Sequence, residues 1–184
     1  VVVPFAPTAT PVDDLVAGRS GAELLDEAQW TWRERLAPVK LLLPFAAANF
    51  GAAMRTAAAH ILVQRDGPAL QPGPRRYTRA WIRDGALMAA ALLRVGEHDA
   101  ALEFVRWYAG FQADDGGVPC CVDRSGPDWL VEHDSHGEFV WGVLECFRFS
   151  GDRAFLDALW PAVLRALAHL DDLRAQRSDA AYAD

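Results

Sequence analysis

Two short stretches of this sequence gather carboxylates, aromatic rings and an arginine. The first, YTRAWIRDGAL at 77–87, contains Trp81, Arg83 and Asp84, and the second, DWLVEHDSHGEF at 128–139, has four acidic side chains beside a tryptophan and two histidines. In carbohydrate sites, aromatic faces pack on the C–H surface of a sugar, and charged groups bind its hydroxyls. The residue types therefore indicate a carbohydrate site.

The first stretch also has a structural explanation. Trp81 and Asp84 are three residues apart and share one face of an expected helix, while Arg83 points about 100° away from Asp84. Asp84 can act as a first-turn carboxylate that complements the helix dipole, with Trp81 as a core aromatic. Taken alone, the stretch leaves both explanations open.

In the second stretch, Glu132 is the expected general acid. It follows the apolar run 129–131, and a carboxyl held among apolar groups keeps its proton to higher pH, as glycosidic cleavage requires. Asp134 and Ser135 have a structural alternative, in which either residue caps the next helix. Glu138 would then complete an arrangement like a capping box.

Glu132 and Asp134 do not make a complete acid and base pair. In an extended segment their side chains face the same way, roughly 6.5–7 Å apart, which resembles the separation in an inverting pair. The acid and the base, however, must lie on opposite sides of the scissile bond, and two residues of one short loop do not straddle it. The base must come from another wall, and no second segment offers an equally good candidate.

Motifs for metals and cofactors are weak or absent. His133 and His136 lack the spacing of a helical zinc motif, and the sequence has no CxxC pair. Cys120 and Cys121 are expected to be small, partly buried residues rather than a redox pair. The GxSxG motif, the P-loop and the dinucleotide-binding glycine pattern do not occur. We therefore expect no metal and no cofactor.

Composition favours one globular domain. The chain has 184 residues, of which 52% are hydrophobic and 23% charged, enough apolar material for a sizeable core. Its net charge of −7, without a basic stripe, argues against a nucleic-acid partner. The longest apolar run, near 36–53, is broken by Lys, Pro and Gly, so we expect a soluble protein with no membrane partner.

Residue usage also suggests the source and location of the protein. The three cysteines form no recognisable disulfide framework, which favours a cytoplasmic location. Arginine greatly outnumbers lysine and alanine is abundant, which suggests a bacterial gene of high GC content. The lead 1–19 is rich in proline, lacks the features of a signal peptide, and is expected to be a linker or the end of an upstream domain.

The remaining chain, 20–184, shows helical periodicity over most of its length. Two loops interrupt the pattern, at 66–78 and 113–135, and the second contains enough apolar residues to be ordered. We expect an all-α fold with helical regions at about 25–36, 46–65, 81–95, 100–112, 137–149 and 152–174, with Pro161 in the first turn of a continuing helix.

Two of these regions repeat weakly. The segments 92–108 and 146–164 share a helix end, a glycine and a following amphipathic helix, and the glycines Gly96 and Gly151 are 55 residues apart. This offset is the length of a helical hairpin. Repeated hairpins stack or close into a toroid, and the helical regions would make about three of them.

Both chemical stretches resemble segments of the six-hairpin glycosidases, most of all glucoamylase and its bacterial relatives. PGPRRYTRAWIRDGALMAAALLRVG resembles the tryptophan–x–arginine–aspartate segment that opens an inner helix in those enzymes. DWLVEHDSHGEFVWGVLECFRFSGD resembles the later segment that carries their general acid. The similarity covers about residues 21–175. It implies an (α/α)6 barrel, of which 20–184 would form about the first half.

The resemblance also implies roles for individual side chains. Arg83 and Asp84 would bind the sugar at the bond to be cleaved, and Trp81 would line that subsite. The acid would be Glu132, with the acidic residues that follow it as alternatives. The expected site consists of catalytic Glu132 and of substrate-binding Trp81, Arg83, Asp84, Trp129, Asp134 and Glu138.

The activity implied by the resemblance is inverting hydrolysis of oligosaccharides. Since the base of these enzymes lies in the second half of the barrel, the chain is expected to be a fragment that is inactive without the remaining half. Two alternatives stay open. One is a non-catalytic toroid that binds carbohydrate or protein, and the other is a glycoside phosphorylase, in which phosphate replaces the activated water.

Overall fold

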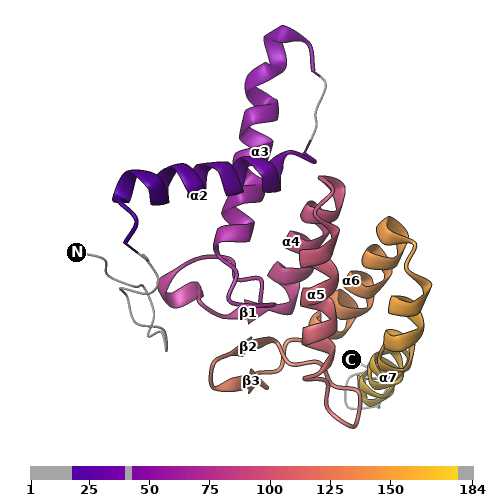
Figure 1. The fold of residues 1–184 in the computed structure, drawn as a ribbon. Helices are drawn as coiled ribbons and strands as arrows, with labels where there is room; N and C mark the ends of the chain where they lie inside the picture. Colours follow the sequence, from indigo (N-terminus) through magenta and orange to yellow (C-terminus); the bar gives the residue numbers. More distant parts are fainter. Residues whose placement is uncertain (1–17, 40–42, 178–184) are drawn as a thin grey trace. The chain divides into compact units, whose positions relative to one another are not determined.

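The structure, a computed structural model, describes residues 18–39 and 43–177 (Figure 1). Most of the proline-rich lead expected at 1–19 lies outside these residues. The first described helix, α2 (Gly21–Leu36), belongs to a compact unit that ends at Pro38, and all later elements belong to a second unit that begins at Val39. The expected site lies entirely in the second unit.

The second unit is mostly helical, as the sequence predicts, and it also contains a small antiparallel sheet that the sequence analysis did not foresee. Its elements are η1 (Phe45–Ala47), α3 (Ala48–Val63), η2 (Arg75–Tyr77), β1 (Ala80–Trp81), α4 (Ile82–Arg94), α5 (His98–Ala109), β2 (Cys121–Asp123), β3 (Gly126–Asp128), α6 (Ser135–Ser150) and α7 (Arg153–Arg177).

The last four helices form two hairpins. Gly96 joins α4 to α5 and Gly151 joins α6 to α7, and both glycines have a positive φ, of 91° and 67°. Left-handed backbone is easiest for glycine, which explains the repeated residue at the two turns. Helix α4 packs on both α5 and α6, and α6 packs on α7, so the two hairpins share one core (Figure 1).

The core of these hairpins depends on one very close helix contact. A Cβ atom at Gly85 of α4 would lie 2.1 Å from Cζ of Phe104 on α5, so only glycine leaves room for the ring. Tyr108, one turn later, is also buried, and its hydroxyl donates a 3.0 Å hydrogen bond to the Pro119 carbonyl. Other large buried side chains are Ile82, Leu92, Leu93, Phe139, Val143, Phe155 and Val163.

Helix α7 differs from the expectation near Pro161. The proline lies inside a continuous helix rather than in its first turn. The Asp152 carboxylate accepts a 2.9 Å hydrogen bond from the Phe155 amide, which caps the helix well before the proline. The cap, rather than the proline, sets the start of α7.

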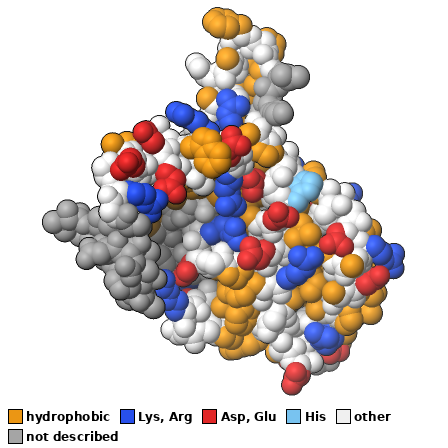
Figure 2. Space-filling view, in the orientation of Figure 1, with side chains coloured by type: hydrophobic (Ala, Val, Ile, Leu, Met, Phe, Trp, Pro, Cys, Tyr) orange, Lys and Arg blue, Asp and Glu red, His pale blue; other side chains and the backbone are white. Residues whose placement is uncertain are grey.

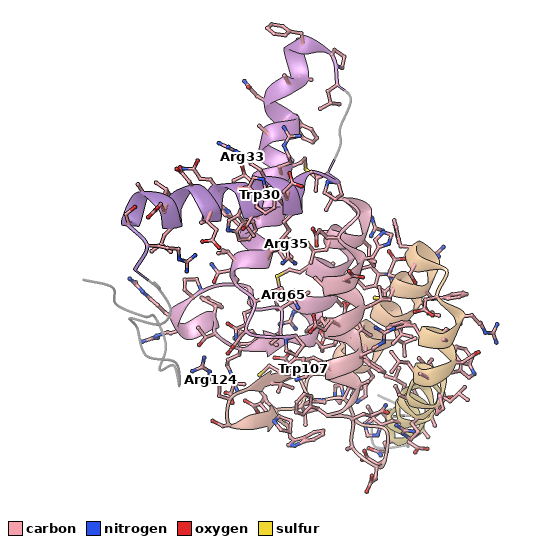
Figure 3. The ribbon with its side chains drawn as sticks, in the orientation of Figure 1. Trp30, Arg33, Arg35, Arg65, Trp107 and Arg124 are labelled. Carbon is pink, nitrogen blue, oxygen red and sulfur yellow. The ribbon has the colours of Figure 1, made fainter. Side chains whose placement is uncertain are left out.

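Charged side chains tie several elements together near the surface. Arg65, which follows α3, pairs with Glu103 of α5 at 2.5 Å, and Trp107 of α5 packs edge-on against Phe111 (Figure 3). Acidic and basic side chains are interspersed on the face drawn in Figure 2. Among residues 18–39 and 43–177, none of the helices combines the length and apolar character that crossing a membrane needs.

The sheet occupies the region that the sequence analysis expected to be an ordered loop. Trp81 of β1 pairs with Cys121 of β2, and Cys121 also pairs with Asp128 of β3. The turn between β2 and β3 is tight: the Ser125 amide donates to the Asp123 carboxylate at 2.7 Å, and Gly126 has φ 115°. The three strands therefore join the start of α4 to the segment that leads into α6.

Candidate acid and sugar site

The sheet brings the two chemical stretches together. The Ile82 amide, at the start of α4, donates to the Cys120 carbonyl at 3.1 Å, and the Cys120 amide donates to the Asp128 carbonyl at 3.2 Å. The chain then runs from Asp128 toward α6. As a result Arg83, in the first turn of α4, contacts acidic residues that follow it by 49 and 51 positions.

Arg83, Glu132, Asp134 and Glu138 form what we call the Arg83 cluster. Nη1 of Arg83 donates to Oε2 of Glu132 at 3.0 Å and to Oδ2 of Asp134 at 2.9 Å. The hydrogen bonds to Asp134 and then to Glu132 raise the pKa of Arg83 above its already high ordinary value. The guanidinium is therefore a fixed positive charge between two carboxylates.

Glu138 is the third carboxyl of this cluster, and its pKa is raised. It lies in the first turn of α6 and is partly buried. Burial raises its pKa, the negative charge of Asp134 raises it further, and Arg83 acts in the opposite direction. A carboxyl of raised pKa beside ionised partners is how enzymes separate an acid from a base.

The hydrogen-bonding capacity of the Arg83 cluster is only partly used. One guanidinium nitrogen serves both carboxylates. Within the part of the chain that the structure describes, Nε and Nη2 of Arg83 and the second oxygens of Glu132 and Asp134 have no hydrogen-bond partner. The side chains are 43%, 28% and 45% exposed for Arg83, Glu132 and Asp134, so these atoms are open to a ligand.

The start of α6 does not use the cap that the sequence suggested as a structural alternative. Asp134 occupies the N-cap position, but its side chain makes no cap hydrogen bond and binds Arg83 instead. The Ser135 hydroxyl is buried without a partner among the described residues. A true capping box is present in α2, between Ser20 and Glu23. The Asp134 carboxylate thus serves the cluster rather than its helix.

Glu132 lies in different surroundings from those expected. The apolar run before it does not enclose it, because Trp129, Leu130 and Val131 are 49%, 66% and 74% exposed. Its carboxylate is paired with Arg83 at 3.0 Å. The apolar run 129–131 therefore does not enclose Glu132, and its role as the acid stays a prediction.

Trp81 and Asp84 lie beside the cluster in sequence but make separate contacts. Trp81 is extended, with φ −75° and ψ 136°, so it does not share a helix face with Asp84. Its ring lies under Arg79 at 5.7 Å and near Tyr77 at 6.1 Å. Asp84 is in the first turn of α4, and its side chain has no hydrogen bond or ion pair within the described ranges. The interpretation of Asp84 as a first-turn carboxylate that complements the helix dipole therefore stays open.

A second arginine cluster, which the sequence did not predict, lies on the strands beside α4. Arg79 donates through Nε to Asp123 at 3.1 Å and through Nη2 to Asp128 at 2.7 Å, and we call these residues the Arg79 cluster. The other oxygens of these carboxylates accept the Ser125 and Leu130 amides at 2.7 and 3.0 Å. The only sequence signal was the Ser-Gly turn that places the two aspartates on neighbouring strands.

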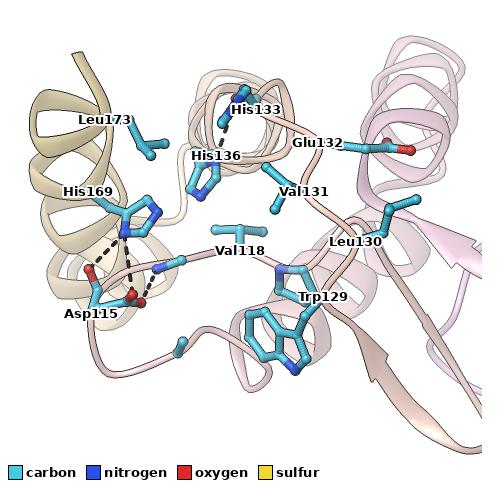
Figure 4. Close-up of a pocket in the computed structure, with 13 residues that line it drawn as sticks. Asp115, Val118, Trp129, Leu130, Val131, Glu132, His133, His136, His169 and Leu173 are labelled. Atoms are coloured by element: carbon cyan, nitrogen blue, oxygen red, sulfur yellow. Dashed lines mark hydrogen bonds and ion pairs between the residues drawn. The ribbon is translucent and has the colours of Figure 1, made fainter. Parts of the chain in front are cut away.

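A pocket of about 210 Å³ lies on the other side of the segment that carries Glu132. Figure 4 shows His136 and His169 side by side in this pocket, while the Glu132 carboxylate points away from them. Asp115 and the exposed Trp129 also border it. The sequence suggested only a weak zinc motif for His136 and no role for His169. Their proximity could not be predicted, because it depends on the packing of α7 against α6.

One group of side chains has the composition of a metal site. The ligand atoms of Cys120, Cys121 and Asp128 lie within 4.8 Å of one another. Asp128, however, is held by Arg79, and burial raises the pKa of both thiols, that of Cys121 to about 12. The Asp128 oxygen that a metal would need is thus already engaged by Arg79. The cysteines are buried and free, as side chains that fill the core.

Comparisons of the chain with protein-family models, with curated proteins and with solved structures give no match. The function therefore has to be argued from the geometry of the site.

Proposed function

We propose that the Arg83 cluster is the acid side of a glycoside-cleaving site, in a chain that forms part of an (α/α)6 barrel of the glucoamylase type. The observation that carries the proposal is the partly used guanidinium of Arg83, which lies beside Glu138, a carboxyl of raised pKa. Charged donors and acceptors left open in this way suit the dense hydroxyls of an oligosaccharide. The two helical hairpins support the barrel architecture.

Each side chain has a defined role in this proposal. Arg83 donates Nε–H and Nη2–H to sugar hydroxyls, and the free oxygens of Glu132 and Asp134 accept from them. Protonated Glu138 gives its proton to the glycosidic oxygen as the bond from the anomeric carbon to that oxygen breaks. Water attacks the anomeric carbon from the opposite face and loses its proton to a base. Asp84, Trp81 and Trp129 extend the sugar contacts.

Glu138 replaces Glu132 as the preferred acid in this proposal. Glu132 is paired with Arg83 at 3.0 Å, whereas burial and then the charge of Asp134 raise the pKa of Glu138. The base is proposed to come from the remaining half of the barrel, so the present chain supplies one side of the site. Measurable hydrolysis of an oligosaccharide by the purified 184-residue chain would contradict this half-site.

The charge balance argues against phosphorolysis. A phosphate needs net positive charge, and Arg83 is compensated by Glu132 and Asp134. A non-catalytic carbohydrate-binding toroid uses the same donors and differs only at Glu138, which would then have no role in turnover.

The experiment compares two matched variants, Arg83→Met and Arg79→Met, for binding of maltooligosaccharides to the chain. Arg83→Met removes the open donors, and losing a charged hydrogen bond weakens binding by about tenfold or more. Arg79→Met leaves the open donors of Arg83 in place, so the dissociation constant should change much less. Circular dichroism checks that both variants are folded. Equal weakening in the two variants, or none in Arg83→Met, rejects the sugar site.

A further inference from the structure

The pocket behind the Arg83 cluster contains two histidines that stack on each other. The rings of His136 and His169 have centroids 4.7 Å apart and are inclined by only 15°. His136 comes from the first turn of α6 and is 6% exposed, whereas His169 comes from α7 and is half-buried. The remaining lining is mostly apolar: Val118, Pro119, Leu130, Val131 and Leu173.

The surroundings of each ring fix where its proton lies. Nδ1 of His136 is 3.4 Å from the His133 carbonyl oxygen, and Nδ1 of His169 is 3.2 Å from the Asp115 carbonyl and 3.7 Å from its carboxylate. All of these partners accept hydrogen bonds only, so each Nδ1 carries the hydrogen. In the neutral rings, each Nε2 is therefore an acceptor.

Neither acceptor is used within the described residues. No hydrogen bond is made by Nε2 of His136 or of His169, although His136 is more than nine-tenths buried. Burial also lowers the pKa of His136, which keeps its ring neutral. Nε2 of His136 is not one of the fully buried atoms that lack a partner, so this acceptor is open to the pocket that the ring lines and can accept from a ligand or water there.

The charge of the pocket narrows the class of ligand. Arginine and lysine are absent from its lining, and Asp115 and Glu132 border it, so an anion is disfavoured. The Asp115 carboxylate already accepts the Gly117 amide at 2.8 Å and lies near His169. What remains unsatisfied is a pair of hydrogen-bond acceptors against an apolar wall. A matching ligand has hydroxyl donors on one side and a C–H surface on the other.

We propose that this pocket is a second ligand site, separate from the Arg83 cluster, which binds a small neutral polyhydroxy compound through Nε2 of His136 and Nε2 of His169. At about 210 Å³ the pocket is below the usual range for drug-sized ligands, so it suits a single sugar ring. Its apolar wall packs on the C–H face of the ring. The site does not depend on the reaction assigned to the Arg83 cluster, because Glu132 points away from the two histidines (Figure 4).

The test uses the nitrogen signals of the histidine side chains in this chain. The sequence has five histidines, so single substitutions assign every signal. On titration with methyl α-D-glucopyranoside, the Nε2 signals of His136 and His169 should shift and saturate at millimolar concentration. The signals of His60 and His98, which do not line the pocket, should stay in place.

Matched variants separate binding from stability. His169→Phe keeps a ring against His136 but removes one acceptor, and should weaken binding several-fold. His169→Gln offers an amide oxygen in its place and should bind the glucoside more tightly than His169→Phe. His60→Phe, on an exposed position of α3, is the control and should bind normally.

Three results would overturn the proposal. The first is the absence of saturable shifts at His136 and His169 in the folded wild-type chain. The second is a shift that Arg83→Met abolishes and His169→Phe leaves intact, which would place the sugar in the Arg83 cluster alone. The third is a saturable shift with Zn²⁺ and none with the glucoside, which would make the two imidazoles metal ligands.

Discussion

Arg79 and Arg83 lie four residues apart, and each binds two carboxylates from the segment 123–134. Arg79 uses separate nitrogens for Asp123 and Asp128, and both carboxylates also accept backbone amides. Arg83 uses one nitrogen for two carboxylates and leaves the rest of its guanidinium open. Similar residue types thus produce one cluster whose carboxylate oxygens are all hydrogen-bonded, which we call saturated, and one whose carboxylates keep open oxygens, which we call unsaturated.

The difference follows from the backbone around each arginine. Asp123 and Asp128 lie at the ends of paired strands, where their carboxylates also satisfy turn amides. The carboxylates of the Arg83 cluster come from the irregular segment before α6 and from its first turn, and they make no cap there. The Arg79 cluster uses its carboxylates within the fold, whereas the Arg83 cluster keeps donors and acceptors open, which is the basis of the binding role that we propose for it. Each of the following changes affects one cluster and spares the other.

Under the proposed function, the largest effect is expected for Glu138→Gln, measured in a longer form of the protein that shows oligosaccharide hydrolysis. The amide keeps the shape of the side chain but has no proton to give, so kcat should fall by about 10²–10⁴-fold with little change in sugar binding. Steady-state kinetics and binding of an uncleaved sugar measure the two effects.

Glu132→Gln is the matched control for that experiment. It removes one of the two carboxylates on Arg83 and should change KM more than kcat, because Glu132 binds sugar in the proposal. If Glu132→Gln abolishes turnover and Glu138→Gln does not, the acid is Glu132.

A smaller effect is expected for stability when the saturated cluster is broken. Arg79→Met leaves Asp123 and Asp128 facing each other without a cation, so the urea midpoint should fall. Arg124→Met is the control, since Arg124 is 77% exposed, lies at the tip of the hairpin (Figure 3) and pairs only with Asp66 among the described residues. That exposed pair contributes at most about 1 kcal/mol. Equal losses in the two variants would show that the Arg79 cluster adds no more than a surface pair.

The smallest effect concerns the pH dependence of stability, to which Asp128 and Glu138 contribute with opposite signs. Arg79, and then the Leu130 amide, lower the pKa of Asp128, so its stabilising contribution is present above about pH 4 and is lost as the pH falls through the lowered value. Burial raises the pKa of Glu138, so its contribution is present below about pH 4 and is lost as the pH rises through the raised value.

Two substitutions test the opposite pH dependences of Asp128 and Glu138. Asp128→Asn should be less stable than the wild type at pH 7, and Glu138→Gln should be slightly more stable. The Glu138→Gln difference should shrink as the pH falls from 7 through the raised pKa of Glu138 toward about 4, whereas the Asp128→Asn difference should shrink only as the pH falls below about 4, through the lowered pKa of Asp128. Urea denaturation across that range measures them, and a loss of stability in Glu138→Gln at pH 7 would contradict the raised pKa.

The hairpins were predictable because their signals are local. Gly96 and Gly151 end helices with left-handed turns, and apolar spacing marks the helices on each side. The sheet was not predictable in the same way, because strands of two or three residues are too short to show an alternating pattern. Closure of the hairpins into a barrel stays a prediction.

The candidate site was predictable by residue type but not by arrangement. The sequence singled out Arg83, Glu132, Asp134 and Glu138, and the structure places them in one cluster. The sequence could not show which carboxylates Arg83 would bind, since that depends on pairing between strands that are far apart along the chain. The partnership of His136 with His169 was hidden for the same reason, because it depends on packing between α6 and α7.

Residues can be added at the tip of the hairpin between β2 and β3 without changing the strand pairing that positions the site. Arg124 and Ser125 form its exposed tip, while the pairing of Trp81 with Cys121 and of Cys121 with Asp128 lies at the opposite end of the strands. Exposed loop tips tolerate insertions. A peptide tag or fluorophore attached at this tip would therefore leave Arg83 and Glu132 in register, which gives the molecule a built-in handle for immobilisation or labelling.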